Sequence, residues 1–415
     1  MPLPVRSLPV LQNWDCHGCS DCCRTYAVPL SDEERQRIEG QGWANEPGFS
    51  GVELFTTVKG NTSLAHRPGG GCVFLNEDGR CRIHAKFGSA AKPLACRAYP
   101  FVLVPGGDHW RVGLRFTCPS VAENKGRPMG VHANDAAAYG AELEPRGRPA
   151  ELPPPELQAG QSVSWSDLHR FTKAIGDIVS TPDVPMEHKL RHVLKLSRTL
   201  RKLRFDKVTG QRLSELLEVL TEATAEEVET NANVPPPGWV GRTVFRQLAA
   251  IHTRVDLGPN RGTMTESGWF GRMFAGYRFA WGGGAMPRVN GLLPDGIRFE
   301  DAERPAGPLP AESEELFARY FRVKLDSLQF AGAINFHLPY WPGLDSLVLI
   351  FPMTLWLGRL LTTPDRPRPI AIREALRIVD DSYGFNALLK GKLAGGLRSL
   401  DIKDELPRLV AHYAR

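Results

Sequence analysis

Eight cysteines are the residues of this chain best suited to chemistry, and all of them lie within its first 118 residues. Their thiolates are soft ligands, of the kind that hold zinc or iron–sulphur clusters. In a reducing compartment such thiols stay free or bind metal, whereas disulphide scaffolds belong to oxidising compartments. The clustering therefore predicts a metal centre built from Cys16, Cys19, Cys22, Cys23, Cys72, Cys81, Cys96 and Cys118.

The first four cysteines stand close together in the sequence Cys16-His-Gly-Cys19-Ser-Asp-Cys22-Cys23. Two-residue gaps let successive thiolates face one ion or cluster, as in ferredoxin-type and zinc sites. Cys22 and Cys23 are adjacent, and adjacent side chains diverge in most backbone conformations. We therefore expect one of these two to be replaceable, because it either serves a second site or is a spare or redox thiol. Ser31 and Glu34, further along, have capping-box spacing and predict the start of a helix.

A turn sequence, Asn76–Gly79, predicts a hairpin that carries Cys72 on one arm and Cys81 on the other. A four-residue loop places Phe74 opposite Cys81, so that the two thiols project from one face within reach of a shared metal. His84 lies three residues beyond Cys81. It is either an alternative ligand or a hydrogen-bonded structural imidazole.

A second turn, Pro105–Asp108, predicts a hairpin between Phe101–Val104 and His109–Thr117. Extension of that ladder, with a bulge, would bring Cys96 and Cys118 onto one face. The chain then delivers cysteines from several separate places to a common region, which structural packing rarely demands.

Arginines accompany the thiols at Cys23-Arg24, Cys81-Arg82 and Cys96-Arg97. Several thiolates in one place carry a net negative charge, which neighbouring guanidinium groups would offset while donating hydrogen bonds to sulphur. The alternative is that the three are chance neighbours in a chain with many arginines.

Beyond the cysteines, the proline-rich segment Glu144–Pro155 predicts a linker, after which helical periodicity dominates. The predicted helices are Trp165–Ser180, Met186–Lys207, Arg212–Glu229, Gly241–Arg254, Glu312–Leu328, Leu344–Leu361 and Ile370–Leu389. The sequence therefore predicts an α+β fold. An irregular cysteine-rich domain with small β-hairpins spans residues 1–135, a linker spans 136–160, and a mainly α-helical domain spans 161–415.

The composition, with 42% hydrophobic and 23% charged residues and a net charge of +5, is that of an ordinary soluble protein. Met186–Lys207 is strongly basic, which indicates a solvated face or the docking of an acidic partner; without aromatic stacking it does not predict nucleic-acid binding. Leu344–Leu361 contains Asp345, Pro352 and Arg359, so a buried core helix explains it better than membrane insertion. The first 15 residues hold no apolar run of signal-peptide length, and we expect a cytoplasmic protein.

The cysteine motifs resemble those of the CxxCxxCC cysteine-cluster family of zinc- or iron-chelating proteins. The resemblance rests on Cys16-x-x-Cys19-x-x-Cys22-Cys23, Gly71-Cys72-x-Phe74-Leu75, Cys81-x-Ile83-His84 and the segment from Lys92 to Pro100. The length and layout are also similar to a branch of that family, the flagellin lysine N-methylases. That resemblance implies methyl transfer from S-adenosylmethionine to lysines of a protein substrate such as flagellin. It also implies that the cysteines hold an iron–sulphur cluster, with zinc as the alternative.

The chain departs from the usual methyltransferase patterns. No strand precedes a glycine-rich nucleotide-binding turn, and the Cys-x-x-x-Cys-x-x-Cys order of radical enzymes is missing. A methylase would need another cofactor pocket, for which Gly258–Gly284 and the helix beginning near Glu314 are the expected walls. Tyr320 is a candidate for deprotonating the substrate lysine. The other interpretations are a non-catalytic module that chelates zinc, and a redox or metal-handling protein with a reactive spare thiol.

Overall fold

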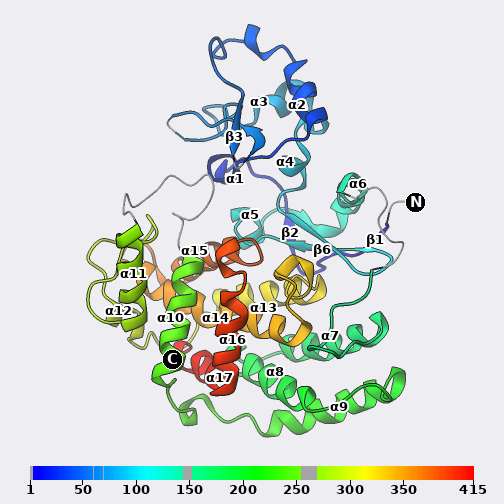
Figure 1. Cartoon of the computed structure of the whole chain (residues 1–415), viewed down its shortest axis with the longest axis vertical. Coiled ribbons are helices and arrows are strands. Elements are labelled where there is room, and N and C mark those ends of the chain that lie inside the picture. Colours follow the sequence, from blue (N-terminus) through cyan, green and yellow to red (C-terminus); the bar gives the residue numbers. More distant parts are fainter. Residues whose placement is uncertain (1–2, 59, 69, 144–151, 254–268) are drawn as a thin grey trace.

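The computed structural model describes residues 3–58, 60–68, 70–143, 152–253 and 269–415. Its fold is α+β, as the sequence predicts, with small β-hairpins in the N-terminal part and helices in the rest. Figure 1 shows the N-terminal segment, in blue, as a lobe at one end of a larger helical body, with strand β6 near the junction.

The N-terminal part alternates short strands and short helices. Its elements are β1 (Val5–Ser7), β2 (Asn13–Trp14), α1 (Asp21–Thr25), α2 (Asp32–Glu39), β3 (Phe55–Val58), β4 (Asn61–Leu64), α3 (Arg82–Phe87), α4 (Leu94–Ala98), β5 (Phe101–Pro105), β6 (Trp110–Leu114), α5 (Pro119–Ala122), β7 (Arg127–Pro128) and α6 (Ala133–Leu143). Strands β1, β6 and β5 form one sheet, in which β1 is parallel to β6 and β5 is antiparallel to it. Strands β2 and β7 form an antiparallel pair, and so do β3 and β4.

The capping box at the start of α2 is confirmed. Ser31 Oγ accepts a hydrogen bond from the Glu34 amide at 3.2 Å, and Glu34 Oε2 accepts one from the Ser31 amide at 3.0 Å. These two bonds satisfy donors that the first turn of a helix otherwise leaves free.

The hairpin predicted around Asn76–Gly79 is wrong in its second arm. The chain does turn back there, but Leu75 rather than Phe74 bridges to Cys81, and helix α3 begins directly after Cys81. The helix explains the difference, because it carries Ile83 into a small apolar core that contains Phe74. A ladder of two or three residues would stabilise this segment less than that burial does.

The hairpin predicted around Pro105–Asp108 is confirmed as β5 and β6, with Phe101 opposite Leu114. Its extension toward Cys96 is wrong, because residues before Pro100 form helix α4 instead of a strand. Pro100 lacks the amide hydrogen that a continued ladder would need.

The helical part consists of longer elements. They are α7 (Trp165–Val179), α8 (Met186–Arg201), α9 (Gly210–Glu226), α10 (Trp239–Thr253), α11 (Trp269–Trp281), α12 (Phe299–Glu303), α13 (Ala311–Asp326), α14 (Tyr340–Leu361), α15 (Arg368–Ser382), α16 (Lys392–Ile402) and α17 (Glu405–Tyr413). Each of the seven predicted helices has a counterpart here, whereas α11, α12, α16 and α17 were not predicted. Helix α6 occupies part of the range predicted as a linker, and residues 144–151 of that range lie outside the described residues.

Helix α14 is the centre of the larger core. It is long and apolar enough to cross a membrane, but 94% of its most apolar window is buried inside the protein, as expected for a core helix. The apolar residues of β5 and β6, among them Phe101 and Val112, belong to this same core. A second, smaller core in the N-terminal lobe is built around Trp43, Phe49 and Phe74.

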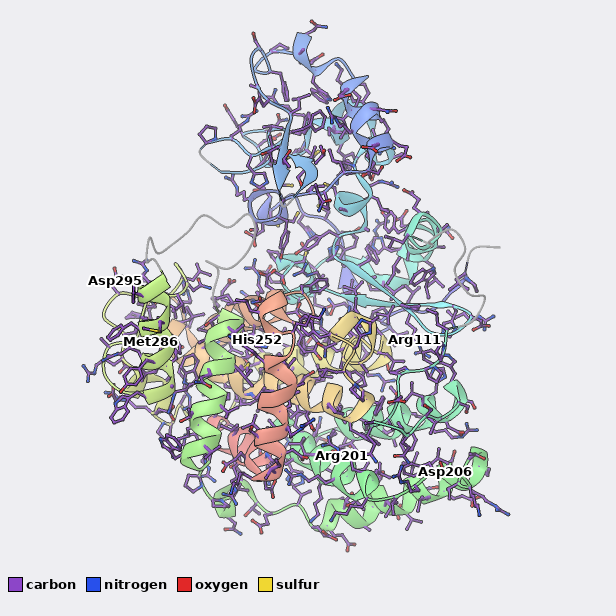
Figure 2. All side chains as sticks on the ribbon, in the orientation of Figure 1. Arg111, Arg201, Asp206, His252, Met286 and Asp295 are labelled. Atoms are coloured by element: carbon purple, nitrogen blue, oxygen red, sulfur yellow. The ribbon has the colours of Figure 1, made fainter. Side chains whose placement is uncertain are left out.

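The basic helix α8 does not present a solvated face along its whole length. Arg191 is buried and pairs with Glu187 at 2.8 Å, and Arg201 pairs with the buried Asp345 at 2.7 Å. Arg201 lies among the helices of the body in Figure 2. The solvated-face interpretation is therefore wrong for these two arginines, whose charges are neutralised inside the protein.

Candidate metal centre

Helix α1 carries the two adjacent cysteines, Cys22 and Cys23. Successive residues of an α-helix point about 100° apart around its axis, so Cys22 and Cys23 address different neighbours. Their sulphurs nevertheless lie only 3.9 Å apart. The side chains therefore diverge less than the sequence predicts, and the pair stands at a junction between two groups of thiols.

One group, called here the Cys72 set, gathers against the small core of the N-terminal lobe. Cys72 is buried in that core, and Cys23, Cys81 and Cys96 pack against it. The Cys72 amide donates to the Cys23 carbonyl oxygen at 2.8 Å. This bond connects α1 to the turn that runs from Cys72 to Cys81, called here the Cys72 turn. Helix α4 brings Cys96 into place, and Glu34 of α2 holds α4 by accepting from the Leu94 amide at 2.6 Å.

The other group, called the Cys118 set, consists of Cys16, Cys19, Cys22 and Cys118. Cys16 and Cys19 are exposed on the loop between β2 and α1, whereas Cys118 is buried directly before α5. The loop is fastened to α5 by a contact of 3.1 Å between His17 Nδ1 and Ser120 Oγ. Gly18, with φ of 66°, supplies the left-handed conformation that reverses the chain between Cys16 and Cys19.

Electrostatic coupling gives the same grouping for the Cys72 set. Burial, together with smaller contributions from thiolates at Cys23 and Cys81, raises the pKa of Cys72 to about 12. Burial likewise raises the pKa of Cys96, with added contributions from the thiolates of Cys72, Cys23 and Cys81. Charges couple in this way when they lie within roughly 10 Å of each other.

The Cys118 set is coupled in the same manner. Burial raises the pKa of Cys118, and a thiolate at Cys19 adds to the effect. The contact with Cys23 and burial raise the pKa of Cys22, to which thiolates at Cys16 and Cys118 add. Cys22 is therefore near Cys16 and Cys118 as well as in contact with Cys23.

The charges of one lysine and one arginine act on the Cys23 thiol. The contact with Cys22 lowers the pKa of Cys23, and the charges of Lys92 and Arg24 lower it further against the opposing effect of burial. Lys92 also lowers the pKa of Cys96. Sequence reasoning missed Lys92 as a partner of the thiols, although it lies in the quoted segment that contains Cys96.

Arg82 and Arg97, which were expected beside sulphur, have other partners. Arg82 donates to Asn76 Oδ1 at 2.5 Å and lies over the Phe49 ring. Arg97 forms a two-bond pair with Glu142, at 2.8 and 2.6 Å. Of the three arginines, Arg24 is the one whose charge acts on a thiol. His84 is exposed on α3.

The thiols of each set are neighbours but do not converge on a point. Among the residues that the structure describes, no three cysteine, histidine, aspartate or glutamate side chains lie close enough to hold one ion. Neutral buried thiols pack as small apolar groups, whereas metal binding requires thiolates and releases their protons. All eight cysteines are free. Four thiols in each set form a donor group that fits zinc or an iron–sulphur cluster.

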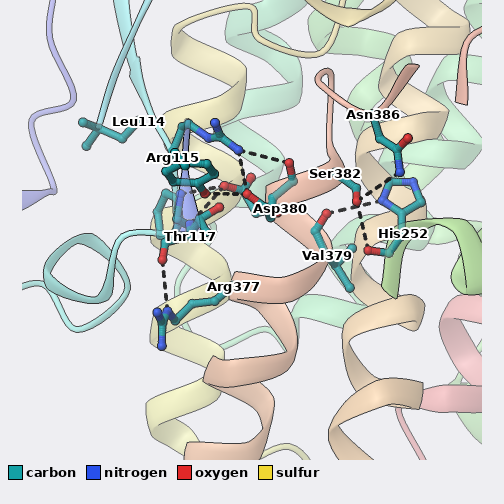
Figure 3. Close-up of polar contacts among 12 residues, drawn as sticks. Leu114, Arg115, Thr117, His252, Arg377, Val379, Asp380, Ser382 and Asn386 are labelled. Atoms are coloured by element: carbon teal, nitrogen blue, oxygen red, sulfur yellow. Dashed lines mark hydrogen bonds and ion pairs between the residues drawn. The ribbon is translucent and has the colours of Figure 1, made fainter. Parts of the chain in front are cut away.

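The segment before Cys118 is held by α15 of the helical body, and Figure 3 shows Asp380 and Arg377 of that helix beside Thr117. Asp380 of α15 accepts hydrogen bonds at 2.6 and 3.3 Å from the amides of Phe116 and Thr117, which are the two residues directly before Cys118. It also pairs with Lys324 of α13 at 2.7 Å. These contacts fix the backbone that leads into Cys118.

Helix α1 is held by the same helix. Arg377 pairs with Asp21 at the start of α1, and Tyr26 just beyond its end donates to Asp381 at 2.5 Å. The positions of the cysteines on α1 therefore depend on α15, which lies far away in the sequence.

A cluster of free thiols in and beside a small, irregular lobe is typical of proteins that bind a metal ion or cluster through thiolates. Residues 15–124 match a family model named CxxCxxCC and described as "Putative zinc- or iron-chelating domain". This part of the chain is similar to that family, as its cysteine motifs predict. The match says nothing of the flagellin methylase branch. No curated protein and no solved structure matches the chain.

The residues expected to serve a methylase are placed differently from the prediction. Tyr320 is fully buried in the larger core, where it packs on Phe116 and donates to Asp380 at 3.2 Å. It is therefore a core residue and cannot face a substrate lysine. Glu314 accepts from the Met186 amide at 2.9 Å and caps α8. Of the segment Gly258–Gly284, residues 258–268 lie outside the described residues.

Proposed function

We propose that the cysteine domain holds iron–sulphur clusters. The cysteine domain resembles a zinc- or iron-chelating domain, and its free thiols are ligands of the kind that hold iron–sulphur clusters. In such a cluster each thiolate binds a different iron, so cysteines from several separate segments can share one centre.

The charges around the Cys72 set also suit a cluster. A metal centre with four thiolates keeps a net negative charge, and Lys92 and Arg24 lie close enough to Cys23 to offset it. Burial of Cys72 and Cys96 would shield the bound centre from water and oxygen. When bound, such a cluster supplies either electron transfer or a cross-link between α1, the Cys72 turn and α4.

Anaerobic purification of the full chain tests the proposal. We expect a brown protein with iron and acid-labile sulphide in comparable amounts and broad visible absorption that is lost on exposure to a chelator and oxidant. A colourless protein with stoichiometric zinc and no sulphide would contradict the iron proposal, while it would leave the metal-binding class intact.

Methyl transfer is a second candidate, supported by a cavity as well as by the family resemblance. A cavity of about 600 Å³ lies between α10, α11 and α16 and is lined by Leu248, Gly276, Phe279, Gly395 and Ser399. That volume is typical of small-molecule sites. Part of α11 belongs to the segment expected to bind S-adenosylmethionine, with flagellin as the type of protein substrate.

Calorimetry with S-adenosylmethionine on metal-loaded protein tests this candidate. A Cβ at Gly395 meets no atom within 4 Å, so Gly395→Phe places a ring in the cavity without a backbone clash. Gly130 is equally open and lies on the exposed turn after β7, so Gly130→Phe is the matched control. We expect micromolar binding to wild type and the control, and at least tenfold weaker binding to Gly395→Phe. Absence of binding to the wild type would leave only the metal site. The free thiols support a reducing, cytoplasmic location for either activity.

A further inference from the structure

We propose that the eight cysteines form two separate four-thiol metal centres, and that the chain divides between them at the Cys22–Cys23 peptide bond. One centre takes the Cys118 set of Cys16, Cys19, Cys22 and Cys118. The other takes the Cys72 set of Cys23, Cys72, Cys81 and Cys96. This inference rests on the proposed metal-binding function and extends it.

The packing of the cysteines against two hydrophobic cores supports the division into two centres. Cys23, Cys72, Cys81 and Cys96 all belong to or pack against the small N-terminal core. Cys118 instead belongs to the larger core of the helical body. Cys72 and Cys118 are thus buried in different hydrophobic cores, and this packing favours separate centres over one centre that uses both thiols.

Backbone contacts assign the other cysteines. The hydrogen bond between the Cys72 amide and the Cys23 carbonyl brings Cys23 to the smaller core. The contact of His17 with Ser120, and the β2–β7 pair behind it, bring the Cys16–Cys19 loop to Cys118.

The helix explains why two adjacent cysteines are useful. A turn of α-helix directs neighbouring side chains about 100° apart, so α1 can offer one thiol to each side. The two centres then lie on either side of α1, joined through sulphurs that are 3.9 Å apart in the free thiol form. Such adjacency brings the centres near enough for electron exchange if both hold iron, as in two-cluster ferredoxins.

Metal analysis of serine variants of the full chain tests the division. We expect wild type to carry two centres, and each of Cys22→Ser, Cys118→Ser, Cys23→Ser and Cys81→Ser to lose half of the bound iron and sulphide, or half of the zinc. The Cys22→Ser/Cys118→Ser pair removes ligands of one centre and should also retain half. The Cys22→Ser/Cys81→Ser pair removes a ligand from each centre and should retain none.

A single centre predicts a different pattern. Loss of all metal in any one of the single variants would overturn the division, and so would equal retention in the two double variants. A wild-type protein that takes up no iron, sulphide or zinc would instead refute the metal-binding function itself, so the two failures are distinguishable.

A second measurement avoids variants that fail to fold. The wild-type holoprotein is treated with increasing chelator and oxidant, alkylated with iodoacetamide, and analysed by peptide mass spectrometry. We expect the Cys118 set, which contains the exposed Cys16 and Cys19, to become labelled as one group before the Cys72 set, with Cys22 and Cys23 labelled at different stages. Parallel labelling of all eight thiols, or simultaneous labelling of Cys22 and Cys23, would overturn the proposal.

Discussion

Replacement of Asp380 by alanine tests whether the helical body holds the cysteine domain in place. Asp380 is only 1% exposed. It pairs with Lys324 at 2.7 Å and accepts from the Phe116 and Thr117 amides at 2.6 and 3.3 Å. The carboxylate therefore neutralises a buried ammonium group and satisfies two backbone donors at once.

The expected cost follows from these partners. Removal of one member of a buried ion pair costs about 3–5 kcal/mol, because the other charge is left without compensation. Each buried amide left without an acceptor costs roughly a further 1–3 kcal/mol, less where water enters the vacated space. We therefore expect Asp380→Ala to lower the free energy of unfolding by about 4 kcal/mol or more. The exposed Asp365 is the control, and Asp365→Ala should change the free energy of unfolding by less than about 0.5 kcal/mol.

Urea unfolding followed by tryptophan fluorescence and circular dichroism measures both variants. The double variant Asp380→Leu/Lys324→Met removes both charges and should recover part of the loss, because the desolvated ammonium is gone. An Asp380→Ala variant within about 1 kcal/mol of wild type, or a double variant no more stable than the single, would refute the account.

Three further predictions concern other parts of the molecule. Burial lowers the pKa of His252 from 6.5 to about 4, so between these pH values the unfolded chain binds a proton that the folded chain excludes. The neutral buried imidazole therefore contributes its full stability above pH 6.5, and this contribution is lost as the pH falls toward 4. Urea unfolding should show a loss of about 2 kcal/mol from this group between pH 7.5 and 5, which His252→Asn abolishes while it keeps a donor for the Val379 carbonyl. A Cβ at Gly343 would lie 2.1 Å from the Phe330 carbonyl oxygen, so Gly343→Ala should lower the melting temperature, whereas Gly276→Ala in open space should raise or preserve it. Chelation of the metal should increase hydrogen exchange in residues 16–98 and leave the buried helix α14 protected; equal exchange in both would contradict the metal's local stabilising role.

Local patterns predict most of the fold. The β5–β6 hairpin follows from a turn sequence between β-prone residues, and α7 and α13 follow from periodic apolar residues on one face. The elements around the cysteines were predicted less well. Helices α3 and α4 are five or six residues long and depend on packing against the smaller core, so their own sequence contains too little information to predict them.

The sequence predicts the eight cysteines as candidate ligands, but it does not predict which of them are neighbours in the fold. The types and spacing of eight cysteines indicate metal binding without any tertiary information. Which thiols are neighbours depends on two separate hydrophobic cores and on long-range contacts such as that of His17 with Ser120. For that reason the strand extension predicted to bring Cys96 to Cys118 was wrong, whereas Cys72 and Cys81 both lie at the smaller core.

The helical body contributes to the metal site although it contains no cysteine. Asp380 fixes the amides before Cys118, Arg377 donates to the Thr117 carbonyl oxygen at 3.1 Å, and Arg377 also pairs with Asp21 on α1. Two ligand-bearing segments, α1 and the turn before α5, are therefore positioned by one face of α15. Because a packed interior transmits displacement instead of absorbing it, contraction of the thiols around a bound metal would act on α15 through these bonds. Metal binding in the N-terminal lobe would then affect the packing of the helical body through Asp21, Thr117 and Asp380.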